Sequence, residues 1–191
     1  MKNKVFLLFV IFALLAVIVP AFAQSEGGSL TIGLSVEPLN IDPASGVYIP
    51  EALVIQQIFD PLVYVDPAGD FVPGLATDWS VNEDGTEYTF HLRTDVKFHD
   101  GTDFNAEAVK FALDRAKKGL TPNAASPALL TTYEETVIVD DATVTVKFSE
   151  TNANFLLDLS RAWLMIPSPS AEEGRLVAAA AFSSWVTMTT V

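Results

Sequence analysis

The feature that most constrains the fold is a pair of alternating segments on either side of an Asp-Gly step. TDWSV (77–81) and EYTFHLR (87–93) flank Asp84-Gly85, and glycine accepts the positive φ angle that a tight hairpin turn requires. The run therefore predicts a β-hairpin. Because side chains alternate between the two faces of a strand, we expect one buried face made of three apolar residues, Tyr88, Phe90 and Leu92.

A helix is predicted soon after this hairpin. Asn105 is a favourable N-cap residue, and Gly119 is well placed to end the helix. Between them, four apolar residues follow the i, i+3, i+4, i+7 spacing of a single helical stripe, namely Val109, Ala112, Leu113 and Ala116.

His99 and Asp100, between the hairpin and the helix, could form a reactive pair or a corner of the chain. Catalysis would need a nucleophile within hydrogen-bond reach, and a zinc site would need three or four convergent ligands. The sequence has only two histidines, His91 and His99, and no cysteine. We interpret His99-Asp100-Gly101 as a turn and His91 as a solvated strand residue. No catalytic residue, metal ligand or cofactor is predicted.

Similar patterns along the rest of the chain predict a mixed α/β (α+β) class with many hairpins. Strands are expected at 30–34, around the turn 67–70, around the turn 140–142, and at 162–169. Short helices are expected at 51–59 and at 152–160, the latter capped by Asn152 or Asn154. Residues 171–191 show no clear amphipathic period.

The first residues are typical of a Sec-type signal peptide. Lys2 and Lys4 precede an apolar block over 5–19, and Pro20 and Ala21-Phe22-Ala23 follow it. This order predicts cleavage between Ala23 and Gln24. The alternative is an uncleaved membrane anchor, which needs roughly 20 apolar residues. The block is shorter than that, so we expect an exported, soluble mature chain.

Charge and cysteine content exclude several classes of function. Without Lys2 and Lys4, the chain keeps 9 basic and 24 acidic residues, a formal charge of −15. Such a surface repels nucleic acid and anionic lipid. The lack of cysteine excludes disulfides, thiolate metal sites and an N-terminal lipid anchor. An exported protein without an anchor is retained by an outer membrane, so we expect a periplasmic location.

One long run carries a family resemblance. PGLATDWSVNEDGTEYTFHLRTDVKFHDGTDFNAEAVKFALDRA (73–116) combines a Leu-Ala-x-x-Trp entry, Tyr-x-Phe-x-Leu-Arg, a Lys-Phe-His-Asp-Gly turn and a Phe-Asn-Ala helix start. It closely resembles the signature region of the extracellular solute-binding proteins, family 5, the peptide, nickel and oligosaccharide receptors of ABC importers. The resemblance extends from Leu30 to Ala171, and residues 172–191 do not resemble the next segment of family members.

The resemblance implies a two-lobed fold that closes on a solute and docks on a permease and ATPase complex at the inner membrane. It also implies the domain boundaries: a signal peptide at 1–23, the start of the first lobe at 24–43, an accessory subdomain at 44–162, and a return to the first lobe at 163–191. The family's second lobe is missing from this chain, which a truncated or frameshifted reading frame would explain.

Three functions compete. The first is the solute-binding component of an ABC importer, most often for oligopeptides, acting as a monomer. The second is a secreted hydrolase, for which the sequence offers no Gly-x-Ser-x-Gly and no His-Glu-x-x-His motif. The third is a non-functional remnant of such a binding protein.

We expect ligand contact in the loop Asn40–Tyr48, because the resemblance places this loop at the family's ligand cleft. Asp42 could pair with the amino terminus of a peptide, Tyr48 offers a flat apolar ring with a polar tip, and Ser45 lies between them. The alternative is that Asp42 only caps the turn before Pro43. A closing cleft needs both walls, so we expect no peptide affinity tighter than about millimolar, near −4 kcal/mol.

Overall fold

The computed structural model describes residues 31–34, 36–46, 48–170 and 179–180. The chain divides into two units, Met1–Gly33 and Leu34–Val191, and every helix and strand below belongs to the second. The predicted signal peptide and its cleavage site at Ala23 and Gln24 lie outside the described residues. Among the helices of the described part, none is long and apolar enough to cross a membrane.

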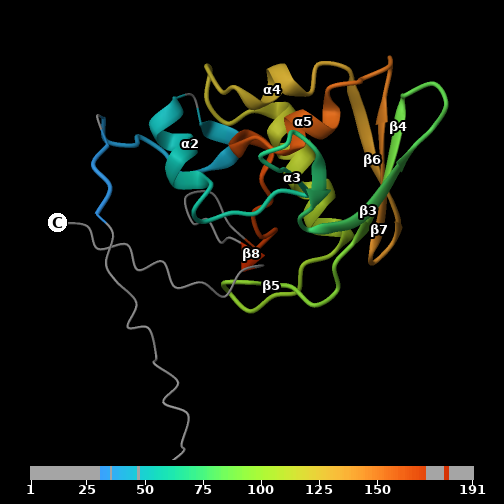
Figure 1. Ribbon diagram of the computed structural model, residues 1–191, viewed down its shortest axis with the longest axis horizontal. Helices are drawn as coiled ribbons and strands as arrows, with labels where there is room; N and C mark the ends of the chain where they lie inside the picture. Colours follow the sequence, from blue (N-terminus) through green and yellow to red (C-terminus); the bar gives the residue numbers. More distant parts are fainter. Residues whose placement is uncertain (1–30, 35, 47, 171–178, 181–191) are drawn as a thin grey trace, which may run out of the picture. The chain divides into compact units, whose positions relative to one another are not determined.

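The largest element is a four-stranded antiparallel sheet in the order β3-β4-β7-β6 (Figure 1). Both predicted hairpins are confirmed, and they meet in its centre, where β4 pairs with β7. Tyr88 lies opposite Val146, and Phe90 lies opposite Val144. The strands are β3 (Ala76–Val81), β4 (Glu87–Leu92), β6 (Tyr133–Asp140) and β7 (Thr143–Phe148).

Only one face of this sheet is packed, as is common for antiparallel sheets. Figure 1 shows α3 (Ala106–Lys118) and α5 (Phe155–Leu159) on the same side of it. The Phe155 ring makes edge contacts with three aromatic rings of the inner face, those of Tyr88, Phe90 and Phe148. The opposite face carries polar residues such as His91, which is exposed as predicted.

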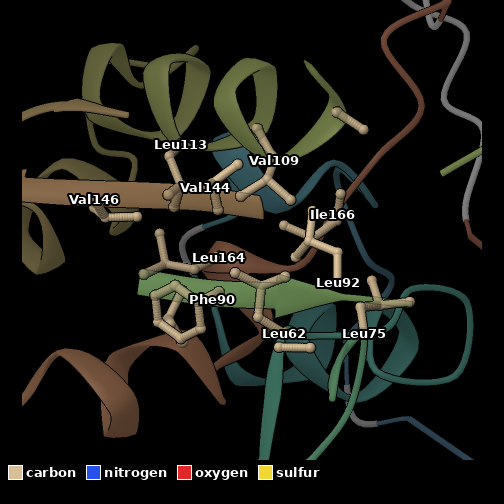
Figure 2. Close-up of a cluster of buried hydrophobic side chains, with 14 of the residues drawn as sticks. Leu62, Leu75, Phe90, Leu92, Val109, Leu113, Val144, Val146, Leu164 and Ile166 are labelled. Carbon is tan, nitrogen blue, oxygen red and sulfur yellow. The ribbon is translucent and has the colours of Figure 1, made fainter. Parts of the chain in front are cut away.

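Helix α3 begins and ends as the sequence predicts. The Asn105 side chain accepts a hydrogen bond from the Ala108 N–H at 3.2 Å, and Gly119 follows the last turn with φ of +63°. The predicted stripe is buried, and Figure 2 shows Val109 and Leu113 extending from α3 toward Val144 of β7. These contacts close the main hydrophobic core.

The remaining elements are short. Strands β1 and β2 pair around the predicted turn 67–70, and the predicted helix 51–59 is α2, which begins two residues earlier and ends at Ile55. Strand β5 pairs with β8. Their bounds are η1 (Pro43–Ser45), α2 (Ile49–Ile55), β1 (Val63–Val65), β2 (Phe71–Pro73), β5 (Lys97–Phe98), α4 (Ser126–Leu129), η2 (Ala162–Leu164) and β8 (Ala179–Ala180). The mixed α/β class is confirmed.

Two predicted strands are wrong. Residues 31–34 are exposed and have no regular structure, because no strand of the described residues pairs with them. The segment 162–169 begins as the 3-10 helix η2. It separates two apolar clusters: Leu164 and Ile166 join the main core, whereas Ala162 and Met165 join a second cluster. Its continuous apolar run therefore reflects burial in two clusters and not a strand.

Candidate functional site

The loop Asn40–Tyr48 is held at its centre by the short helix η1. Asp42 caps this helix, since its Oδ1 accepts a hydrogen bond from the Ala44 N–H at 3.0 Å. The Asp42 carbonyl accepts from the Ser45 N–H, also at 3.0 Å. The capping role considered for Asp42 is therefore observed.

Asp42 also has a partner that the sequence did not suggest. Arg115 Nη1 donates to Asp42 Oδ1 at 2.6 Å, and Arg115 Nη2 donates to Oδ2. The pair is largely buried, with the Arg115 side chain 14% exposed and that of Asp42 8% exposed. A guanidinium that binds both oxygens of a carboxylate forms one of the stronger ion pairs in proteins.

Ser45, within the same loop, is buried. Its carbonyl accepts a hydrogen bond from Thr121 Oγ1 at 3.2 Å. The neighbouring Gly46 carbonyl accepts from the Ala125 N–H at 3.1 Å. The segment between α3 and α4 therefore holds this turn by hydrogen bonds to its backbone carbonyls. In the described conformation, Ser45 has a structural role.

Tyr48 is the exposed member of the predicted set. It stands immediately before α2, its side chain is open to solvent at 57% exposure, and its backbone N–H donates to Glu51 Oε2 at 3.0 Å. The structure thus places Asp42 and Ser45 together in one buried turn and leaves Tyr48 accessible three residues later. Contact between these residues and a solute remains a prediction.

His99 and Asp100 form the corner that the sequence predicts, and Asp100 does more than turn the chain. Its carboxylate accepts hydrogen bonds from Thr102 Oγ1 at 2.6 Å, from Ser168 Oγ at 3.1 Å and from Ser170 Oγ. These bonds hold the pKa of Asp100 well below its usual range. Asp100 thereby ties the corner to the segment that follows η2.

His91 and His99 lie in separate exposed places. His91 Nε2 is 3.8 Å from Asp78 Oδ1 on the polar face of the sheet, and His99 is exposed in the corner. Over the described ranges, no group of three or more His, Asp or Glu side chains is arranged to hold a metal ion.

Arg115 is the site residue that sequence reasoning missed. The helical pattern places it in the last turn of α3, where a cation suits the helix dipole, and that local role accounts for an arginine there without any distant partner. Its partner lies 73 positions earlier, and no spacing rule connects the two.

Comparison with known proteins agrees with this architecture. Residues 70–184, more than half of the chain, match the family described as bacterial extracellular solute-binding proteins, family 5 Middle. The match continues to residue 184, so the expectation that the resemblance stops at Ala171 is wrong for residues 172–184. That expectation rested on the last segment's lack of a clear amphipathic period.

Two curated proteins of Escherichia coli are similar to this chain. The periplasmic murein peptide-binding protein MppA is 38% identical over 118 residues, which cover 61% of this chain and 22% of that protein. The dipeptide-binding protein is 36% identical over 110 residues, which cover 48% of this chain and 20% of that protein.

The fold is also found in solved structures. The Escherichia coli murein tripeptide binding protein MppA matches with a TM-score of 0.65 at 26% identity, covering 74% of this chain and 32% of that one. This chain spans between 20% and 32% of the length of these relatives. From the family match and the shared fold, the chain belongs to the bacterial extracellular solute-binding proteins, family 5.

Proposed function

We propose that this chain serves as part of the solute-binding component of an ABC-type importer, with oligopeptides as the solute class. The observation that carries the proposal is the family match over 70–184, which includes both hairpins and helix α3. It is supported by relatives whose names state peptide binding. In this role the chain is a binding protein and not an enzyme, and it delivers its ligand to a permease and ATPase complex at the inner membrane.

The proposal includes the location and the domain plan. The chain is exported to the periplasm after cleavage between Ala23 and Gln24, and it acts there as a monomer. Residues 24–43 open the first lobe, 44–162 form an accessory subdomain beside it, and the chain returns to the first lobe at 163.

Tyr48 is the residue through which we expect this chain to touch a peptide. Its ring is exposed and stands beside a turn that ion pairing and backbone hydrogen bonds hold in place. An aromatic ring with a polar tip suits contact with a peptide side chain or backbone. Asp42 and Ser45 hold the same loop in place, Asp42 through its ion pair with Arg115 and Ser45 through its hydrogen bond with Thr121.

Saturation-transfer NMR with a pool of di- to pentapeptides tests this function, because it detects weak binding. Ligand sites bury most of a small ligand's surface, and this chain spans between 20% and 32% of the length of the relatives named above. We therefore expect dissociation constants of about millimolar or weaker. Tyr48→Ala should remove the signal. Tyr64→Ala is the matched control, since Tyr64 is also exposed but lies on β1.

Two results would contradict the proposal. One is the absence of saturation transfer from every peptide in the pool. The other is a signal of equal strength in the Tyr48→Ala variant and in the unsubstituted chain, which would place the contact elsewhere. Micromolar binding in calorimetry would support peptide recognition but would overturn the expected weakness.

A further inference from the structure

The ion pair between Asp42 and Arg115 connects two distant parts of the chain. Asp42 precedes η1, whereas Arg115 lies in the last turn of α3. Both side chains are largely withdrawn from water. Removing one partner from such a pair leaves an uncompensated buried charge, whereas removing both is far less costly. The loop and the helix are therefore linked through two complementary charges.

The guanidinium of Arg115 is held from a second direction as well. Its Cζ lies 5.9 Å from the centre of the Phe111 ring, one helical turn earlier on α3, within the range of a cation–π contact. Asp42 Oδ1, in turn, also accepts from the Ala44 N–H. Each partner thus has a further contact that fixes its orientation.

The ion pair also changes the charge that the loop presents. Asp42 is neutralised by Arg115, and Glu51 is buried. Among the described positions of 36–56, the one exposed charged residue is Glu37. The same stretch exposes large apolar side chains, Leu39, Tyr48, Ile49 and Leu53. The exposed side chains of this stretch are therefore mostly apolar and carry little charge.

We propose that Arg115 is a positioning residue for solute contact: by pairing with Asp42 it fixes the turn 42–46 and so the placement of Tyr48. The inference rests on the proposed function for its biological meaning. In this role the Asp42 carboxylate serves as the partner of Arg115 and not as the acceptor for a solute's ammonium group. The loop then meets an uncharged part of the solute.

Spin labelling tests the positioning role without any solute. The chain has no cysteine, so Tyr48→Cys gives a single attachment site for a nitroxide. A second labelled variant, Val139→Cys, reports on the exposed part of β6. Electron paramagnetic resonance then compares mobility at position 48 with mobility on the sheet.

Four backgrounds, beginning with the otherwise unsubstituted chain, separate positioning from general loosening. Arg115→Met should convert most of the signal at position 48 to a mobile component and leave position 139 unchanged. The double variant Asp42→Asn with Arg115→Met should return the position 48 spectrum toward the original, because no buried charge remains and the amide oxygen still accepts from Ala44. Lys110→Met is the control, since it breaks an exposed ion pair with Asp114 on the same helix and should change neither spectrum.

The proposal fails if Arg115→Met leaves the position 48 spectrum unchanged, or if it mobilises positions 48 and 139 alike. If Arg115→Met does not fold, Arg115→Lys takes its place. The same criteria then apply to the smaller increase in the mobile component that this variant should produce. Because these measurements use no peptide, their failure leaves the NMR test of solute binding intact, and failure of that test leaves the positioning result intact.

Discussion

Gly46 and Trp163 lie so close together that no side chain fits at position 46. A Cβ atom placed on Gly46 would stand 2.0 Å from Cζ3 of the Trp163 ring and 2.5 Å from Cε3. The indole therefore occupies the space beside the turn that carries Asp42 and Ser45. This contact joins the candidate loop to η2, which is more than a hundred residues later in the chain.

Gly46→Ala should destabilise the protein by about 1–3 kcal/mol, the usual cost of adding atoms to a well-packed site. Urea denaturation measures the change. Gly33→Ala is the control, because no atom lies within 4 Å of a Cβ at that position, and its effect should be small. Trp163→Leu added to Gly46→Ala should recover part of the loss by making room. Equal stability of Gly46→Ala and the unsubstituted chain would refute the close contact.

Phe155→Ala should cost about 3–5 kcal/mol of unfolding free energy. Phe155 is fully buried, and its ring touches those of Tyr88, Phe90 and Phe148, so the substitution leaves a cavity under the sheet. Leu157→Ala, two residues later on the same short helix, is the matched control because Leu157 is 40% exposed. Its cost should stay near 0.5 kcal/mol or below, roughly the range of surface changes. Similar losses in the two variants would show that α5 does not pack as described.

Asn105→Ala should destabilise the protein by about 1 kcal/mol, because the first turn of α3 loses its side-chain cap. Asn105→Ser keeps an oxygen that can accept from the Ala108 N–H and should retain most of the stability. Guanidinium denaturation of the two variants gives the comparison. A loss of the same size in both would assign the effect to something other than capping.

Asp100 should make stability depend on pH in the acid range. Its pKa is depressed in the folded state by hydrogen bonds from Ser170 and Thr102, so its contribution is complete above the unfolded pKa of about 4. That contribution is lost progressively as the pH falls from there toward the folded pKa. The difference in Tm between the unsubstituted chain and Asp100→Asn should therefore be constant above about pH 5 and shrink below about pH 4.

His99→Ala is the control for this titration, since His99 lies in the same exposed corner. It should leave the acid dependence unchanged, and any solute affinity as well. A difference between Asp100→Asn and the unsubstituted chain that stays constant down to about pH 2 would mean that Asp100 does not make these hydrogen bonds in solution.

The mature chain is expected to begin at Gln24. Ala21-Phe22-Ala23 supplies the small residues that a signal peptidase requires after an apolar block. N-terminal sequencing of protein recovered from a periplasmic extract checks this. Ala23→Tyr should block cleavage, whereas Ala21→Ser should allow it. Recovery of a chain that keeps Met1 in the membrane fraction would be the contrary result.

The sequence by itself determined many of the local elements of this protein. Both hairpins, the boundaries of α3 and the buried stripe along it could be predicted from residues a few positions apart. The Asp84-Gly85 turn, the Asn105 cap and the alternating strand residues act within one turn or one strand pair. These local features depend only on residues close in sequence, so they can be predicted from the sequence pattern.

Only the tertiary structure decided how these elements are joined. Asp42 pairs with Arg115, which is 73 positions away, and Asp100 accepts a hydrogen bond from Ser168, which is 68 positions away. The apolar segment 162–169 resembles a strand in sequence, but its side chains pack into two separate hydrophobic clusters. In each case the deciding partner is remote in sequence. Burial then selects the pairing, because a buried charge or polar group is stable only where its complement already lies.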